Sequence, residues 1–312
     1  MIIVTGGLGF IGYNLIKKLN SLKIYNIIIV DTKKKKLNNL KKIKYSKFIE
    51  TKKFYKDIER HIKKNIKCIF HQGANSSTTE TNRQKIYEQN YYSSIKLLEC
   101  AKKNNIKFIY ASSAATYGTN TKSFSEKNWK LKPANLYGKS KLDFDKYVNK
   151  ELKKRKTQIV GLRYFNVYGP FEFHKKNMAS VVFNFNKKFK KEKVVSLFKG
   201  SHGYKNGEQL RDFIHVDDCI KVNLYFFNNT MSGIFNVGTG KCEKFNKVAD
   251  IILKYHRAET NRKKYIKFPK KLIKTYQSYT KANISKLLKS GYNKEFISLN
   301  VGVKRYLNFL NK

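Results

Sequence analysis

The chain has 312 residues, 41% of them hydrophobic, and 67 lysines and arginines stand against 21 aspartates and glutamates, for a formal net charge of +46. The length and hydrophobic content predict a soluble globular protein, built as one large domain or two coupled lobes. Such a basic balance is typical of proteins that bind nucleic acid or anionic membranes. The lysines are nevertheless spread along the whole chain, beside only three prolines and one tryptophan. That distribution favours drift toward AT-rich codons over a surface specific for nucleic acid.

Several local features argue against other classes of site. The four cysteines form no CxxC pair, so we expect free thiols in a reducing cytoplasm and neither a zinc site nor a redox motif. His71 and His174 have no partner at ligand spacing, and no metal is expected. The first residues, MIIVTGGLGFIG, have glycines where a signal peptide has an apolar core, and no run approaches the roughly 18 apolar residues of a membrane span. We therefore expect a cytoplasmic protein without a membrane partner.

The first half of the chain alternates short β-branched runs with longer segments of helical period. Strands are predicted at 2–6, 27–31, 68–74, 108–113 and 159–169, and helices from about Ile11, around 86–103 and from Tyr137. This alternation predicts an α/β fold of Rossmann type, with a doubly wound parallel sheet. Runs such as IIIV are apolar on both faces, as expected for strands covered by helices on both sides.

A second lobe is expected after about residue 170, where the alternation becomes less regular and segments such as FNKVADIILKYH (245–256) predict helices. We assign residues 1–168 to a cofactor-binding domain, to which part of 212–240 returns. Residues 169–312 are assigned to a smaller, mainly helical substrate-binding lobe.

The stretch TGGLGFIG follows the first strand and opens the first helix, with glycines at 6, 9 and 12. Glycines at such a turn let backbone N–H groups meet a pyrophosphate, although a tight turn alone would also explain them. Asp31 ends the second strand, about 20 residues further on, where a carboxylate can hold ribose hydroxyls. Lys33 to Lys36 follow and could hold a 2′-phosphate instead. We therefore favour NADP over NAD.

The candidate reaction centre is formed by Ser113, Tyr137 and Lys141. Ser113 ends the fourth strand, and the tyrosine and lysine are spaced i, i+4, so both project from one helix face. A nearby ammonium favours the ionised phenol, which lets a tyrosine with a pKa of about 10 act near neutral pH. The Ser113 hydroxyl can hold the substrate oxygen. After a dinucleotide turn, this combination predicts an oxidoreductase centre.

Together, TGGLGFIG, SSAATYG, YGKSK, RYFNVYGP and RDFIHVDD resemble the extended short-chain dehydrogenase/reductase family of nucleotide-sugar enzymes. More narrowly, HQGANSSTTE, HKKNMASV, GEQLRDFIHVDD and FNVGTG resemble the family of ADP-L-glycero-D-manno-heptose 6-epimerases of lipopolysaccharide synthesis. The similarity covers essentially the whole chain. It implies epimerisation at C6 of the heptose, by transient oxidation to a ketone with a tightly bound NADP that returns the hydride to the opposite face.

The resemblance implies two acid/base residues, because the hydroxyl points in opposite directions in the two epimers. Tyr137 is the first, and Lys175, which follows the His of the HK motif, is the second. A base at Lys175 needs a lowered pKa, which a cationic nicotinamide and Lys141 would favour. No family role falls on Lys176.

The remaining site residues follow from the same resemblance. The expected cofactor-binding residues are Gly6, Gly9, Phe10, Ile11, Gly12, Asp31, Thr32, Lys33, Lys36, Gln72, Gly73, Ala74, Asn75, Ser76, Asn90, Tyr137, Lys141, Val167 and Lys175. The expected substrate-binding residues are Ser113, Asn166, Asn177, Phe198, Ser201, Arg211 and Tyr276. Arg211 also suits a diphosphate by its own chemistry, since a guanidinium can bind phosphate through two hydrogen bonds. The chain departs from the family pattern at Phe171 and Phe173, where an arginine and a glycine are expected.

Two alternatives stay open. One is a UDP-hexose 4-epimerase or 4,6-dehydratase of the same family, although Ala114 stands where dehydratases have an acidic pair. The other is a non-catalytic dinucleotide fold that binds RNA or DNA by charge, which would concentrate lysines on one face and break the active site. The partner that we expect is a small nucleotide sugar, with no specific nucleic acid, and the family suggests a homo-oligomer.

Overall fold

The computed structural model divides the chain into two compact units. It describes residues 1–32, 41–119, 123–154, 157–269, 273 and 275–312, apart from the side chains of Lys154, Lys176 and Asn177. Unit 1 comprises Met1–Thr116, Asn135–Arg163 and Ile220–Phe235, and unit 2 comprises Tyr117–Ala134, Tyr164–Cys219 and Asn236–Lys312. Each unit thus contains segments that are distant in the sequence, and the division of binding roles between them stays a prediction.

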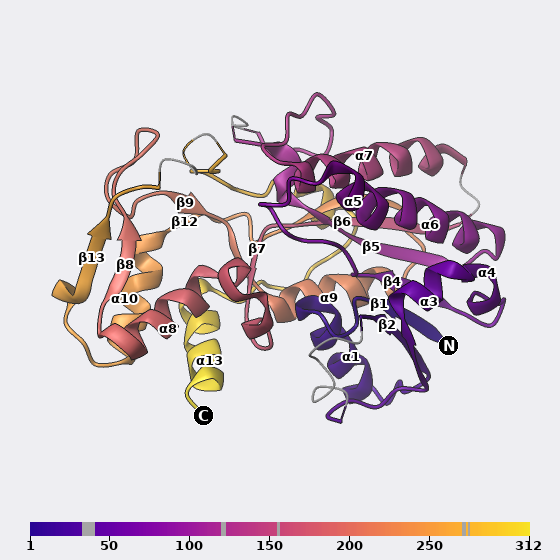
Figure 1. The fold of residues 1–312 in the computed structure, drawn as a ribbon, viewed down its shortest axis with the longest axis horizontal. Coiled ribbons are helices and arrows are strands. Elements are labelled where there is room, and N and C mark those ends of the chain that lie inside the picture. Colours follow the sequence, from indigo (N-terminus) through magenta and orange to yellow (C-terminus); the bar gives the residue numbers. More distant parts are fainter. Residues whose placement is uncertain (33–40, 120–122, 155–156, 270–272, 274) are drawn as a thin grey trace. The chain divides into compact units, whose positions relative to one another are not determined.

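Unit 1 is built on a seven-stranded parallel sheet with the order β11-β6-β5-β4-β1-β2-β3 (Figure 1). Its strands are β1 (Ile2–Thr5), β2 (Ile27–Asp31), β3 (Lys47–Glu50), β4 (Cys68–His71), β5 (Lys107–Ser113), β6 (Ile159–Tyr164) and β11 (Gly233–Val237). β1 pairs in parallel with both β2 and β4, so the strand order reverses at β1. The sheet confirms the predicted Rossmann-type fold, in which ligands bind beyond the carboxyl ends of the strands at such a reversal.

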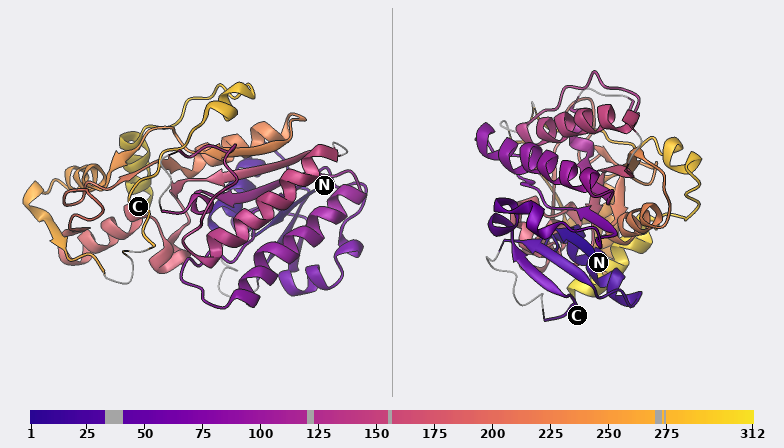
Figure 2. Two further views of the ribbon diagram at one scale, coloured as in Figure 1. Left: turned by 90° about the horizontal axis from the view of Figure 1, so that it is seen from above. Right: turned by 90° about the vertical axis from the view of Figure 1, so that its right-hand side faces the viewer.

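Helices cover both faces of this sheet, as Figure 2 shows. They include α1 (Phe10–Ser21), α3 (Thr51–Lys56), α4 (Ile58–His61), α5 (Arg83–Tyr87), α6 (Ser93–Lys103), α7 (Leu136–Glu151) and part of α9 (Val216–Phe227). Adjacent residues of β4 show the two faces, because His71 is hydrogen-bonded to Ser94 of α6 whereas the Phe70 ring contacts Phe227 of α9. The continuous apolar character of the strands reflects this double burial.

Three sequence predictions differ from the observed elements. The run 159–169 is two strands, β6 and β7 (Asn166–Tyr168), which belong to different sheets. The strand predicted at 68–74 ends at His71 and is followed by a loop. The helix predicted around 86–103 is interrupted by a π-helical turn, η1 (Glu88–Tyr92), between α5 and α6. The sequence prediction of one continuous helix did not include this turn, whose hydrogen bonds run from residue i to i+5.

Unit 2 combines helices with three two-stranded sheets. The sheets pair β10 (Phe213–His215) with β7, β12 (Glu243–Lys244) with β9 (Leu210–Arg211), and β13 (Lys263–Ile266) with β8 (Val195–Phe198). Its described residues include the helices η4 (Phe173–Met178), α8 (Val181–Glu192), α10 (Phe245–Tyr255), α12 (Ser285–Lys289), α13 (Leu299–Leu310) and the short turn η5 (Thr260–Arg262). α8, α10 and α13 bury a common apolar core that includes Phe189, Ile252 and Val303. In the described part of the chain, no helix has the length and apolar character that crossing a bilayer requires.

Candidate functional site

The turn after β1 has glycines where a side chain would not fit. Gly6 has a φ of +62°, and a Cβ there would lie 2.6 Å from the Cα of Gly73. A Cβ on Gly12 would lie 2.2 Å from the carbonyl oxygen of Gly6. These contacts let the turn, the first residues of α1 and the loop after β4 approach at backbone distance. The glycines therefore have a structural reason that is independent of any ligand.

The same turn fits a dinucleotide phosphate. α1 begins after Gly9 without a side-chain cap, its first residues are Phe10 and Ile11, and its first turn has no acidic residue. The backbone N–H groups and the helix dipole therefore favour an anion at this end. The Asp31 carboxylate accepts hydrogen bonds from the backbone N–H groups of Leu8, at 2.8 Å, and Thr32, at 2.7 Å.

Asp31 thus joins the end of β2 to the glycine turn, a link that the sequence did not predict. Lys33 and Lys36, on which the preference for NADP rests, lie outside the described residues.

The loop after β4, residues 72–76, is held by Asn90 of the π-helical turn. The backbone N–H of Asn75 donates to the Asn90 side chain at 2.7 Å, and the Asn90 amide donates back to the Asn75 carbonyl at 2.9 Å and to the Ser140 hydroxyl at 3.1 Å. Asn90 is fully buried, whereas its neighbour Gln89 is exposed, so Asn90 is the residue of this pair that faces the loop. The geometry favours a positioning role for Asn90 over the direct cofactor contact that we expected.

The rest of this loop is fixed by two further hydrogen bonds. The backbone N–H of Gly73 donates to the Thr5 hydroxyl at 3.1 Å, and the Gln72 amide donates to Asn223 at 3.1 Å. Ala74 and Ser76 are exposed. His71 is buried between the Thr5 and Ser94 hydroxyls, and burial lowers its pKa to about 3, so it is a neutral structural residue.

The predicted reaction centre lies on α7 beside the end of β5. Asn135 caps α7 by accepting the backbone N–H of Gly138 at 2.8 Å. The helix then presents Tyr137 and Lys141 on one face, and Ser113 lies near enough to Tyr137 to lower its pKa. The Lys141 ammonium donates to the Ala111 carbonyl at 2.8 Å. The structure therefore brings together the serine, tyrosine and lysine that the sequence singled out.

The electrostatics of this centre differ from the sequence expectation. Burial raises the pKa of Tyr137 above 10.0, the hydrogen bond from Ser113 acts in the opposite direction, and Asp145 raises it further. Burial also lowers the pKa of Lys141 to about 8. The expected lowering of the tyrosine pKa by Lys141 is not among the causes of its shift, and the Lys141 ammonium donates to the Ala111 carbonyl. Desolvation dominates both groups.

Asp145 extends the same helix face and was missed in the sequence. It lies four residues beyond Lys141, is fully buried and forms an ion pair with Arg163 of β6 at 2.7 Å. Its carboxylate also accepts the hydroxyls of Tyr110, at 2.8 Å, and Ser112, at 2.9 Å. Asp145 raises the pKa of Lys141 and so opposes the effect of burial. The spacing i, i+4, i+8 of Tyr137, Lys141 and Asp145 places all three on one helix face and could have identified Asp145 from the sequence.

The segment that carries Lys175 belongs to unit 2. Lys175 is on η4, its pKa is lowered by burial, and Glu172 opposes that effect. Glu172 is fully buried and accepts the backbone N–H and the hydroxyl of Ser180, at 2.5 and 2.6 Å, where α8 begins. Of the two departures from the family pattern, Phe171 has a φ of +70° and packs on Phe309, and Phe173 is exposed. The Asn177 side chain lies outside the described residues.

Three of the predicted substrate-side residues also meet in unit 2. The buried Arg211 guanidinium lies 4.8 Å from the centroid of the Tyr276 ring, and the Phe198 and Tyr276 rings are 6.3 Å apart. The Ser201 hydroxyl accepts the Gln209 amide at 3.4 Å. These contacts form a cationic and aromatic surface suited to a diphosphate or a base.

A strand pair fixes the β7 residues near this group. Asn166 and Val167 pair with Phe213 and Ile214, and the Asn166 amide donates to the Asp212 carbonyl at 3.1 Å. Asp212, another missed residue, is fully buried and accepts the backbone N–H groups of Thr239, Gly240 and Ala282 at 2.7–3.0 Å. It therefore joins the RDF segment to two later loops.

Known proteins resemble the chain over nearly its full length. The family model described as "NAD dependent epimerase/dehydratase family" matches residues 2–238. The crystal structure of Helicobacter pylori ADP-L-glycero-D-manno-heptose-6-epimerase is similar at 31% identity and a TM-score of 0.85, covering 99% of this chain and 96% of that one.

Two other epimerase structures cover 99% of this chain. UDP-N-acetylglucosamine 4-epimerase from Methanobrevibacter ruminantium has 25% identity, a TM-score of 0.86 and 97% of its own length covered. UDP-glucose 4-epimerase from Thermotoga maritima has 26% identity, a TM-score of 0.82 and 98% covered.

Proposed function

Because this chain belongs to the NAD dependent epimerase/dehydratase family, we propose that it inverts C6 of the heptose in ADP-D-glycero-D-manno-heptose to form ADP-L-glycero-D-manno-heptose. The observation that carries an epimerase reaction is the alignment of Tyr137 and Lys141 on one face of α7, with Ser113 near the tyrosine. The glycine turn and Asp31 of the same unit fit a dinucleotide. The choice of substrate is supported by the 31% identity to a 6-epimerase, against 25% and 26% for the two 4-epimerases.

In this proposal the side chains of the chain hold the sugar and move protons. Tyr137 takes the proton of the C6 hydroxyl in one epimer and Lys175 takes it in the other, while Ser113 holds the oxygen. Lys175 suits this role because burial lowers its pKa, which increases the neutral fraction at a given pH. The chemistry that a bound nicotinamide supplies is reversible hydride transfer, so the oxidation and the reduction leave it unchanged overall.

We further propose that the retained cofactor is NADP and that the product serves lipopolysaccharide core synthesis in the cytoplasm, with the enzyme as a homo-oligomer. The preference for NADP is supported by the lysines that follow Asp31. Asp31 uses its carboxylate on the backbone N–H groups of Leu8 and Thr32, which reduces its capacity for ribose hydroxyls. Mass spectrometry of the nucleotide released from the purified protein tests this choice.

The test of the reaction is to incubate the protein in D₂O with ADP-D-glycero-D-manno-heptose and, in parallel, with UDP-glucose. We expect epimerisation of the heptose without deuterium at C6, because the hydride is returned internally. Turnover of UDP-glucose alone would replace the proposed substrate by a hexose. Deuterium at C6 would replace the hydride mechanism by one of proton exchange.

A further inference from the structure

A cationic groove lies in unit 1, at the end of the sheet opposite to the glycine turn. It has a volume of about 930 Å³ and lies beside Met1, before β1, and Lys47, the first residue of β3. Gly6 follows the last residue of β1. At about 3.3 Å per strand residue, the four residues of β1 separate the two ends by roughly 13 Å. The groove is therefore distinct from the predicted cofactor site.

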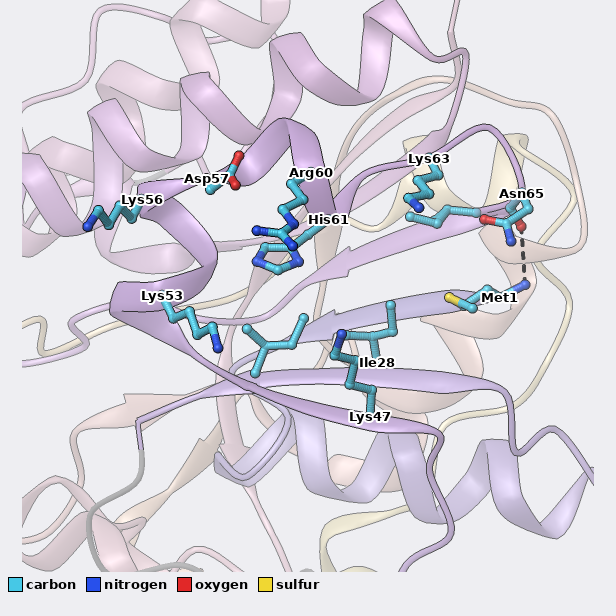
Figure 3. A pocket seen from close by; sticks show the side chains of 12 residues that line it. Met1, Ile28, Lys47, Lys53, Lys56, Asp57, Arg60, His61, Lys63 and Asn65 are labelled. Carbon is cyan, nitrogen blue, oxygen red and sulfur yellow. Dashed lines mark hydrogen bonds between the residues drawn. The ribbon is translucent and has the colours of Figure 1, made fainter.

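The walls of the groove are basic and its floor is apolar. Ile28 of β2 pairs in register with Lys47, and Ile49 follows on the same face of β3, so the sheet supplies apolar surface beneath an ammonium group. Helices α3 and α4 provide Lys53 and Arg60 on the opposite wall. Figure 3 shows the side chains of Lys47, Lys53 and Arg60 directed toward the same space, whereas Lys56 points away.

The charges in the groove are not balanced by the protein. Its lining includes five basic side chains and a single carboxylate, Asp57. Within the described part of the chain, the side chains of Lys47, Lys53, Arg60 and Lys63 have no ion pair. Like charges that converge on one space raise the free energy of the folded state, and an anion bound there would lower it. Neighbouring Glu59 does not compensate, because it pairs with Lys103.

We propose that this groove binds a small multivalent phosphate anion. Phosphate is the ligand that a guanidinium and ammonium groups bind most readily together, through charge-assisted hydrogen bonds. The volume is within the range of about 300–1,000 Å³ that is typical of small-molecule sites. The isoleucine floor gives an organic part of such a ligand, such as a nucleoside, a surface to contact. The proposal is independent of the proposed epimerase activity.

The test measures binding of sodium triphosphate by calorimetry at a constant ionic strength of about 0.15 M, which screens distant charges. The variant is Lys53→Gln/Arg60→Gln. Its charge-matched control is Lys304→Gln/Arg305→Gln, on exposed positions of α13 in unit 2. The net charge of +46 attracts any anion. Binding in the groove is therefore measured by the difference in affinity between the groove variant and the control. ATP in a parallel titration distinguishes a nucleotide from an inorganic phosphate.

We expect the dissociation constant for triphosphate to rise about tenfold or more in the groove variant and less than about twofold in the control. An equal loss of triphosphate affinity in both variants would overturn the proposal. Displacement of triphosphate by a lower concentration of an oligonucleotide would also overturn it, in favour of nucleic acid.

A second measurement uses the unmodified protein. His61 lines the groove, and its pKa is lowered first by burial and then by the charge of Lys47. Bound triphosphate should therefore raise the pKa of His61 in an NMR titration, and an unchanged value would contradict the proposal. Retention of the nucleotide cofactor, which depends on the opposite end of the sheet, should be equal in all variants.

Discussion

The two lysines of the proposed mechanism have similar electrostatic surroundings but different backbones. In unit 1 burial lowers the pKa of Lys141, and the buried carboxylate of Asp145 opposes it. In unit 2 burial lowers the pKa of Lys175, and the buried carboxylate of Glu172 opposes it. Lys141 and Asp145 are one turn apart on a 16-residue helix, whereas Lys175 and Glu172 lie on an irregular segment in which the backbone N–H of Lys175 donates to the Glu172 carbonyl.

The difference shows that a regular helix lets the electrostatics of a site be read from spacing, whereas an irregular segment does not. We also expect the protein to respond differently to replacement of the two carboxylates. Asp145 is paired with the buried guanidinium of Arg163, whose charge loses this carboxylate if Asp145 is replaced. Glu172 accepts its hydrogen bonds from uncharged groups of Ser180, so its removal leaves dipoles unpaired and also removes the charge that raises the pKa of Lys175.

The largest effect is expected from removing either proposed acid/base group. Tyr137→Phe and Lys175→Met should each lower the epimerisation rate by about 10²–10⁴-fold, the usual contribution of a general acid or base. Matched controls are Tyr147→Phe, on the same helix, and Lys187→Met, at an exposed position of α8, which should change the rate less than about twofold. A rate assay of all four variants tests the two-base proposal. Full activity in Lys175→Met would remove unit 2 from the proton transfers.

The next effect concerns the buried ion pair. Asp145→Asn should lower the free energy of unfolding by about 3–5 kcal/mol, because Arg163 would keep a buried charge without its carboxylate. Denaturant unfolding measures the change, with Glu192→Gln as the control, since its pair with Lys188 at 3.5 Å is exposed and contributes little. An equal decrease in the free energy of unfolding of both variants would mean that the buried pair of Asp145 and Arg163 contributes no more than an exposed one.

Glu172→Gln should lower the free energy of unfolding by a smaller amount, about 1–3 kcal/mol, because the amide retains one acceptor oxygen for the Ser180 groups. The loss of the carboxylate should also lower the pKa of Lys175 further, since Glu172 is the charge that raises it. The limb of the pH–rate profile that reports Lys175 should therefore move to lower pH. A profile that stays in place would separate Glu172 from the reaction and leave it a purely structural role.

The last effect is a pH dependence of stability. The pKa of Lys141 is lowered from 10.5 to about 8, so the unfolded chain binds more protons than the folded one between these values. The destabilisation by Lys141 is thus complete below about pH 8 and fades as the pH rises toward 10.5. Lys141→Met should be more stable than the unmodified protein at pH 7, and this advantage should shrink at pH 10. A constant difference would show that the ammonium is not desolvated.

Some of the site was predictable because it depends on local spacing. The glycines at 6 and 12 were identified from their position between a strand and a helix, and each has the close backbone contact that such a turn requires. The pair Tyr137 and Lys141 was identified from the i, i+4 spacing. Asn90 was singled out from the sequence, but its buried position depends on a π-helical turn that no periodicity indicated.

The sequence alone determined the alternation of strands and helices, the order of the chemical groups and the family, because these depend on residues close together in the chain. Tertiary structure decided which carboxylates became buried partners of the catalytic candidates. Asp145 meets Tyr110 and Ser112 of β5 across more than 30 residues, and Asp212 meets the loop at 239–240. Burial then set the direction of each pKa shift, because desolvation depends on everything packed around a group and not on its neighbours in the sequence.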